Sequence, residues 1–297
     1  MVENRTLVVG FVGLGMMGTP MSRNLAGAGF DLRVHDADPE RTRAVAAELG
    51  VAAVADPADL AACDVLVTML PTSAIVRSVF LDDDGALAIP LREGTVIVDM
   101  SSSDPAETVE TGRALAAFGV RLVDAPVSGG VPRAAEGTLA IMMGADDEEA
   151  AALAERVVEP MSRSVYRTGA LGTGDAMKAL NNFVAGAAFA ATSEALIAGR
   201  QFGLDAQLMV DILNDSTGQS FSSTHVFGPH VVEERYASGF ALPLITKDIR
   251  IARELQRGLG RDAPVCEAVT AAFGEALDAL GGVDHTEAYR HWSGESR

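Results

Sequence analysis

The chain has 297 residues, 48% of them hydrophobic, and a formal net charge of −18 at pH 7. This length suits one large domain or two ordinary ones, and the charge argues against DNA, RNA or an anionic membrane as a partner, because those surfaces attract a positive footprint. The two cysteines, Cys63 and Cys266, lie far apart in apolar or helix-like stretches. They indicate reduced thiols and a cytoplasmic protein, with a single disulfide as the open alternative. No signal peptide is predicted, because the first apolar stretch, Leu7–Val12, is short and runs directly into the glycine motif. No membrane span is predicted either, because the apolar stretch 183–199 contains Ser193 and Glu194.

The first half of the chain alternates short apolar runs with helix-like segments. Strands are expected at Leu7–Val12, Leu32–His35, Val65–Met69, Val96–Asp99, Arg121–Asp124, Leu139–Met143 and Ser164–Arg167. Helices are expected between them at Met17–Ala28, Pro39–Leu49, Ile75–Phe80 and Pro105–Phe118. Strands that alternate with helices of this length predict βαβ units, right-handed crossovers and a mostly parallel sheet.

The pattern changes near Gly169, and no convincing strand follows Gly174. A single long helix is expected over Asp175–Phe202, and shorter ones at Ala206–Asn214, Thr246–Leu259, Ala263–Ala279 and Thr286–Trp292. The sequence therefore predicts an α/β domain over residues 1–168 and an all-α domain over residues 169–297, joined by a long helix. A long apolar helix with little polar surface favours packing on a second copy, so a homo-oligomer, a dimer or tetramer, is expected.

A glycine-rich segment, Gly13-Leu14-Gly15-Met16-Met17-Gly18, follows the first apolar run. In the G-x-G-x-x-G spacing Gly13 allows a tight turn, Gly15 lets the backbone approach a pyrophosphate, and Gly18 lets the helix pack closely on the strand. The helix start, with Met16 and Met17, offers backbone N–H groups to the diphosphate. The strand–glycine–helix context predicts an α/β Rossmann-like dinucleotide-binding domain, while an ordinary glycine-rich turn is the alternative.

Asp36 ends the second expected strand, about 20 residues beyond the glycines, where an acidic side chain binds the ribose hydroxyls of a dinucleotide. Its carboxylate would repel the 2′-phosphate of NADP, and the next residue is Ala37 rather than a basic one. The sequence therefore predicts NAD, with NADP less favoured. Arg41 and Arg43 lie nearby and are interpreted either as phosphate ligands or as part of a solvated helix face.

Further candidate residues follow strands that end at the same predicted edge of the sheet, where the carboxyl ends of parallel strands surround a ligand. Leu70 and Pro71 follow one strand, and the serines around Ser102 follow another, where a serine also suits the cap of the next helix.

The segment Ser128-Gly129-Gly130 combines a hydroxyl with open backbone N–H groups, which suits a substrate carboxylate. Arg133 lies close behind and is either a second contact to the substrate or a surface partner of Glu136.

Lys178 and Asn182 are four residues apart on the expected long helix and so share one face. Gly172-Thr173-Gly174 precedes them and permits a close approach at the helix start. The residues alone leave Lys178 either as a catalytic amine or as a charged side chain at the start of an apolar helix.

These motifs, together with Gly137-Thr138-Leu139 and Lys247-Asp248, resemble the β-hydroxyacid dehydrogenase family over nearly the whole chain. The branch of 3-hydroxyisobutyrate dehydrogenases and tartronate semialdehyde reductases is the most similar. The resemblance implies an active site between the two domains. It implies that the catalytic lysine is Lys178, the substrate-binding residues are Asn182, Ser128, Gly129 and Gly130, and the cofactor-side residues are Leu70, Pro71, Ser102 and Lys247. Arg133 departs from the glycine common in relatives.

The expected activity is reversible hydride transfer between NAD and a short 3-hydroxy acid of the 3-hydroxyisobutyrate type, with Lys178 as general acid–base and no metal ion. A tartronate semialdehyde (2-hydroxy-3-oxopropionate) reductase is the alternative within the enzyme class. A cofactor-binding protein without turnover is the alternative outside it, and the retention of Lys178, Asn182 and Ser128 argues against that reading.

Overall fold

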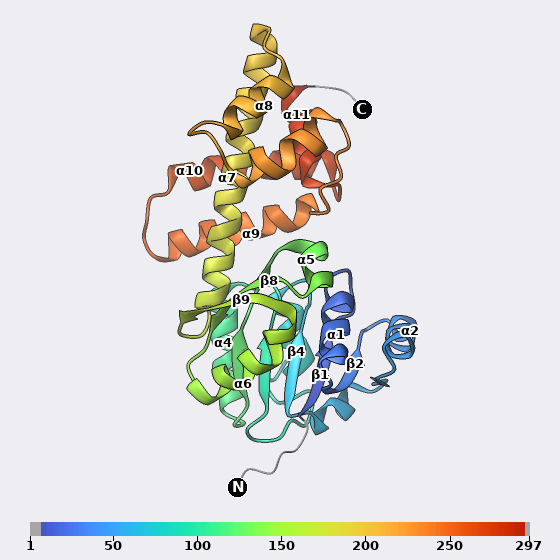
Figure 1. Ribbon diagram of the computed structural model, residues 1–297. Coiled ribbons are helices and arrows are strands. Elements are labelled where there is room, and N and C mark those ends of the chain that lie inside the picture. The colour runs from blue at the N-terminus through green and yellow to red at the C-terminus, as the bar shows by residue number, and fades with distance from the viewer. Residues whose placement is uncertain (1–6, 295–297) are drawn as a thin grey trace. The chain divides into compact units, whose positions relative to one another are not determined.

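The computed structural model describes residues 7–294, and the chain divides into two compact units, Met1–Lys178 and Ala179–Arg297. Unit one contains a mixed, mainly parallel sheet covered by helices, and unit two is built from helices (Figure 1). The long helix α7 (Thr173–Phe202) begins in unit one and continues through unit two. The predicted fold class, a Rossmann-like domain followed by a helical domain, is confirmed.

The sheet of unit one has the strand order β3-β2-β1-β4-β5-β6-β8-β7, and β9 also pairs with β8. Its strands are β1 (Val8–Val12), β2 (Asp31–His35), β3 (Ala52–Ala53), β4 (Val65–Thr68), β5 (Val96–Asp99), β6 (Arg121–Asp124), β7 (Val127–Ser128), β8 (Leu139–Gly144) and β9 (Ser162–Gly169). Neighbours from β3 to β6 run parallel, whereas β8 runs antiparallel to β6 and β7 and parallel to β9. The chain reverses its direction of travel across the sheet between β1 and β4, which is where ligands bind in open α/β sheets.

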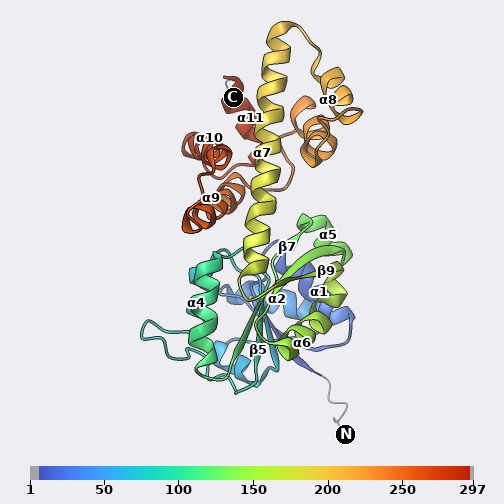
Figure 2. The same ribbon diagram turned by 90° about the vertical axis from the view of Figure 1, so that its left-hand side faces the viewer.

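Helices cover both faces of this sheet. They are α1 (Gly18–Gly27), α2 (Pro39–Leu49), α3 (Ser73–Phe80), α4 (Pro105–Ala116), α5 (Gly130–Glu136) and α6 (Glu148–Val158). Figure 2 shows α4 on one side of the sheet and α1 and α6 on the other. Side chains alternate between the faces: Val65 and Val67 of β4 join the core with α1, α2 and α6, while Leu66 joins the core with α3 and α4.

Four helices of unit one begin at a side chain that accepts hydrogen bonds from otherwise unpaired backbone N–H groups. Asp38, Thr72, Asp104 and Asp147 cap α2, α3, α4 and α6 in this way. The cap of α4 is therefore Asp104, not one of the preceding serines that the sequence suggested.

Unit two packs its helices around aromatic side chains. Beyond α7 it contains α8 (Ala206–Asn214), the π-type helix η3 (Ser223–Val232), α9 (Leu242–Gly258), α10 (Pro264–Leu280), the short η4 (His285–Glu287) and α11 (Ala288–Ser293). Phe189 of α7 stacks on Phe227 with ring centroids 5.0 Å apart and also contacts Phe273 and Trp292. Within residues 7–294 the last strand is β9, and no helix has the length and apolarity needed to cross a membrane.

Several elements differ from the sequence prediction. The two-residue strands β3 and β7 and the helices α5, α6 and η3 were not among the predicted elements. The short or irregular ones carry too little periodicity to be predicted. Helix α9 begins at Leu242, four positions before the expected start, with Pro243 in its first turn, where a proline fits a helix well. The expected last helix is divided into η4 and α11.

Candidate active site

The glycine-rich segment joins β1 to α1 in the conformation that its residues require. Gly13 has φ +99°, and a side chain there would collide with the carbonyl oxygen of Met69. A Cβ on Gly18 would meet the carbonyl oxygen of Gly13, so only glycine allows the helix to start this close to the turn. A Cβ on Gly15 would meet no protein atom within 4 Å. Gly15 therefore leaves open space beside the start of α1, where a pyrophosphate fits.

Asp36 is held beside the glycine-rich segment. Its Oδ2 accepts a hydrogen bond from the Leu14 N–H at 2.7 Å, and its Oδ1 accepts one from the Asp38 N–H at 2.9 Å. The Arg41 guanidinium lies 3.4 Å from Oδ1. Burial alone raises the pKa of Asp36, but the two N–H groups and Arg41 outweigh burial and lower it overall. A carboxylate fixed at this point fits the ribose of a dinucleotide, and the adjacent guanidinium is the available phosphate ligand.

The loops after β4 and β5 meet at the same edge of the sheet. The Leu70 N–H donates to Ser101 Oγ at 2.9 Å, and Ser103 Oγ donates to Asp99 Oδ2 at 2.9 Å. Ser101 and Ser103 are buried in these structural contacts, whereas Ser102 between them is half-buried. The Leu70 side chain also lies against Gly13, so the predicted cofactor residues from β1 and β4 are brought together. Pro71, the next residue, is exposed.

Two glycines with positive φ lie at the start of α5: Gly129, at +141°, precedes the helix, and Gly130, at +65°, is its first residue. Ser128 ends β7 and is half-buried. The Arg133 side chain lies across Gly129, because a Cβ on that glycine would be 2.7 Å from Arg133 Cβ. Among the described residues no ion pair joins Arg133 to Glu136. The surface pair with Glu136 is thus absent, and Arg133 lies beside the predicted carboxylate receptor.

Three buried aspartates lie behind this edge of the sheet. Asp99 and Asp124 face each other in the β5–β6 register, and Asp175 lies in the first turn of α7. Burial raises the pKa of Asp124 to about 6, although N–H groups that donate to it act in the opposite direction. Burial and the neighbouring Asp124 and Asp99 carboxylates raise the pKa of Asp175 well above its usual range. This cluster was not predicted from the sequence, because its members are far apart along the chain.

Lys178 and Asn182 both lie on α7, four residues apart, and Lys178 is half-buried. Asn182 is 6% exposed and donates through Nδ2 to Asp248 Oδ2 at 2.6 Å. Lys247 Nζ lies 3.4 Å from Asp248 Oδ1. Asp248 thus connects two predicted site residues of unit two, Asn182 and Lys247. Sequence reasoning assigned no role to Asp248, since an aspartate after a lysine on a helix resembles an ordinary surface pair.

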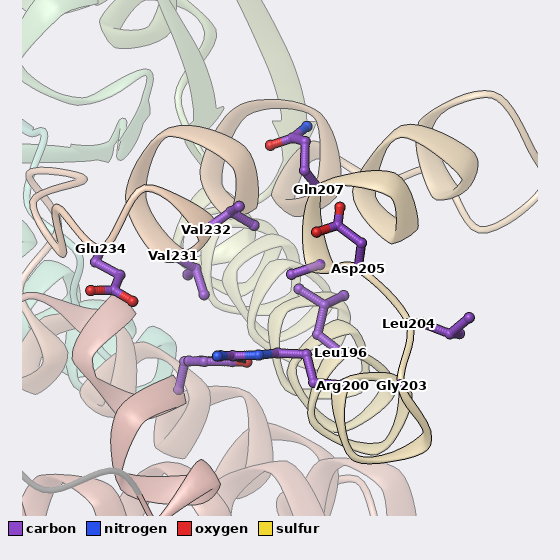
Figure 3. Close-up of a pocket in the computed structure, with 11 residues that line it drawn as sticks. Leu196, Arg200, Gly203, Leu204, Asp205, Gln207, Val231, Val232 and Glu234 are labelled. Atoms are coloured by element: carbon purple, nitrogen blue, oxygen red, sulfur yellow. Dashed lines mark hydrogen bonds between the residues drawn. The ribbon is translucent and has the colours of Figure 1, made fainter.

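A surface pocket of about 580 Å³ in unit two is shown in Figure 3. Its charged lining residues are Arg200, Asp205 and Glu234, with two acids to one base. Of the described residues that line this pocket, none is a predicted site residue. The balance of charge makes it a poor receptor for a carboxylate substrate.

Family models of known proteins match both parts of the chain. A family model described as the NAD binding domain of 6-phosphogluconate dehydrogenase matches residues 8–169. A second, described as "NAD-binding of NADP-dependent 3-hydroxyisobutyrate dehydrogenase", matches residues 172–292.

Among relatives, 2-(hydroxymethyl)glutarate dehydrogenase of Eubacterium barkeri is 34% identical, covering 97% of this chain and 95% of the relative. The human mitochondrial 3-hydroxyisobutyrate dehydrogenase is 36% identical, covering 83% of this chain and 74% of the relative. The structure of Mycobacterium tuberculosis 3-hydroxyisobutyrate dehydrogenase with L-serine superposes with a TM-score of 0.87 at 32% identity, covering 97% of this chain and 99% of that one. The chain therefore belongs to the β-hydroxyacid dehydrogenase family, with the 3-hydroxyisobutyrate dehydrogenases, and is an NAD(P)-dependent oxidoreductase that acts on CH–OH groups.

Proposed function

We propose that this protein transfers a hydride between NAD and a short 3-hydroxy acid, or its semialdehyde, with Lys178 as the general acid–base. The observation that carries the proposal is the pair Lys178 and Asn182 on one face of α7, in a chain whose unit one has the open glycine turn and fixed Asp36 of a dinucleotide site. Asn182 is held by Asp248 and so has a defined orientation.

In the oxidation direction, the Lys178 amine accepts the hydroxyl proton of the substrate. Bound NAD supplies the hydride acceptor. In the reduction direction, the Lys178 ammonium returns a proton to the carbonyl oxygen. General acid–base help of this type is worth roughly 10²–10⁴-fold in rate. Asn182 binds the substrate or orients the lysine, and Ser128 with Gly129 and Gly130 fixes the substrate carboxylate, which sets the position of the reacting carbon.

The substrate class follows from the residues around Ser128. Its hydroxyl and the backbone N–H groups of two glycines suit one carboxylate. Arg133 lies across Gly129 and is available for a second anionic group. One relative is named for a dicarboxylic hydroxy acid, 2-(hydroxymethyl)glutarate, so a second carboxylate is the specific role that we propose for Arg133. Tartronate semialdehyde is the competing substrate for the reduction direction.

The choice of NAD over NADP rests on Asp36. A carboxylate that accepts two backbone N–H groups stays ionised and repels a 2′-phosphate. Arg41 opposes this preference, because its guanidinium already lies next to Asp36. We therefore propose a preference for NAD rather than an exclusion of NADP.

The two cysteines are free and buried, which is consistent with a reducing compartment, and we propose the cytoplasm as the location. We also propose a homo-oligomer, a dimer or tetramer, that forms through α7. One stripe of this helix carries Val184 and Phe202, which are 63% and 88% exposed, at its two ends. Between them come four alanines at alternating spacings of four and three, namely Ala188, Ala191, Ala195 and Ala198. This is the a/d repeat of a helix that packs against another helix.

A substrate panel tests the proposal. We expect activity with NAD on 3-hydroxyisobutyrate, L-serine or 2-(hydroxymethyl)glutarate, or with NADH on tartronate semialdehyde, and at least tenfold lower kcat/KM, ~1.4 kcal/mol, on the methyl ester of the best acid. Hydrogen-bond donors that lose their anionic partner reduce binding, which is the reason for the difference. Equal kcat/KM for acid and ester would contradict the assignment of Ser128, Gly129 and Gly130. Arg133→Ala should selectively impair the dicarboxylate.

A further inference from the structure

The side chain of Asp124, at the end of β6, is fully buried and binds the start of α7. Its Oδ1 accepts a hydrogen bond from the Gly172 N–H at 2.8 Å, and its Oδ2 accepts one from the Asp175 N–H at 2.8 Å. These N–H groups belong to the turn before α7 and to its first helical turn, where backbone donors have no helical partner. A single carboxylate therefore satisfies two donors, one through each oxygen.

The surrounding chain leaves space for this carboxylate and little else. Gly144 of β8 lies opposite Asp124 in the sheet, and a Cβ on Gly144 would be 2.5 Å from Asp124 Oδ1. A Cβ on Gly174 would be 2.8 Å from Asp124 Oδ2 and would also meet the carbonyl oxygen of Met142. The Asp124 carboxylate, together with the carbonyl oxygens of Ala170 and Met142, thus leaves space only for glycine at positions 144 and 174.

The other two acids of the cluster make different contacts. Asp175 accepts from the Ser103 N–H at 3.2 Å and from Thr108 Oγ1 at 2.8 Å, so one of its partners is a hydroxyl that is able to accept in return. Asp99 accepts from Thr68 Oγ1 at 2.8 Å. Both partners of Asp124, in contrast, are N–H groups that only donate. The contacts favour an ionised Asp124 and a neutral Asp175.

We infer that Asp124 is a positioning residue for the reaction. It fixes the first turn of α7 against the end of β6. Lys178 lies in the next turn of α7, and the chain leads from the end of β6 to Ser128. Lys178 follows Asp175 by three residues, and Ser128 follows Asp124 by four. A displacement at either end of this connection changes where the lysine amine lies relative to the bound carboxylate. The inference rests on the proposed roles of Lys178 and Ser128.

The test compares Asp124→Asn with Asp175→Asn. An amide at position 124 would point an NH₂ group at a backbone N–H, whereas an amide at position 175 keeps one acceptor and can donate to Thr108. Asp124→Asn should lower kcat by about tenfold or more. Its Kd for the cofactor, measured by NADH fluorescence, should stay within about twofold of the wild-type value. Asp175→Asn should keep kcat within about twofold of wild type. Equal losses of kcat in both variants, or no loss in Asp124→Asn, would overturn the inference.

A double-mutant cycle separates a positioning role from a merely structural one. In a Lys178→Ala background, Asp124→Asn should change the residual kcat by less than about twofold, because the group it positions is already missing. The same loss as in the wild-type background would show that Asp124 does not act through Lys178. If Lys178→Ala itself retains wild-type turnover, the proposed function fails, and this outcome is distinct from a failure of the Asp124 comparison.

Wild-type protein gives an independent readout should Asp124→Asn not fold. The readout is kcat in the reduction direction as a function of pH. The ionisable groups that face Asp124 are Asp99 from β5 and Asp175 from α7, while β8 contributes Gly144 and Met142. Protonation of Asp124 should lower kcat below about pH 6, and Asp175→Asn should keep this acid limb. A kcat that stays level well below that pH would contradict the inference.

Discussion

At the residue scale, the candidate site depends on side chains whose hydrogen-bond partners are far away in the sequence. Asp36 was predicted from its place after a strand, and the structure adds its bond to Leu14 in the glycine turn. Asp248 and the buried acids Asp124 and Asp175 carried no such signal. Their roles depend on burial and on the N–H groups that donate hydrogen bonds to them, and neither can be read from a single sequence.

Asp36→Ala tests the basis of cofactor preference. Removal of the carboxylate removes both the ribose contact and the repulsion of a 2′-phosphate, and it leaves Arg41 without its 3.4 Å partner. The ratio of kcat/KM for NAD to that for NADP should fall by about tenfold or more. Arg43→Ala is the matched control, since Arg43 is on the same helix and makes no contact with Asp36 among the described residues. A ratio that does not change would exclude Asp36 as the determinant.

At the element scale, most strands and helices of unit one follow from their periodicity and caps. The buried runs of β4 and β5 are visible in the sequence, whereas the cap of α4 was assigned to a serine and is Asp104. The two-residue strand β7 is not visible in the sequence, because Val127 and Ser128 gain their pairing from β8 and not from a local pattern. The start of α7 is similar, since it is fixed from a distance by Asp124. The boundary predicted between residues 168 and 169 stays a prediction.

The first turn of α7 should also control how stability depends on pH. The pKa of Asp175 is raised in the folded state. Above about pH 4, the pKa of an aspartate in the unfolded chain, the folded chain therefore binds more protons than the unfolded chain. Stability is therefore lost as pH rises through the folded pKa, with at most about 1.4 kcal/mol per pH unit. Asp175→Asn removes this loss. Its Tm should gain on wild type in calorimetry as the pH rises above about 5, and parallel Tm curves would contradict the protonated Asp175.

At the scale of the whole molecule, the two units each have their own core, and α7 belongs to both. The composition and the order of strands and helices were enough to predict this division into an α/β part and a helical part. The stripe of α7 from Val184 to Phe202 is among the apolar features that unit two leaves exposed.

An arginine in the middle of the α7 stripe tests the proposed oligomer. Ala195→Arg places a long charged side chain at an a/d position that needs a small one. This variant should therefore be unable to form the oligomer of the wild type. Ala271→Arg, at an exposed alanine of α10, is the control and should leave the mass unchanged. Sedimentation velocity would measure both. A monomeric wild type, or an Ala195→Arg variant with the wild-type mass, would contradict assembly through this stripe.

The central claim is that Lys178 moves the proton in an NAD-linked oxidation of a 3-hydroxy acid, and its most direct test is kcat for Lys178→Ala on the best acid of the panel. We predict a loss of about 10²-fold or more in kcat, with the cofactor Kd and the unfolding midpoint near those of wild type. Retention of most of the turnover, or a collapse of stability in place of a loss of rate, would contradict the claim and leave Lys178 as a structural charge at the start of an apolar helix.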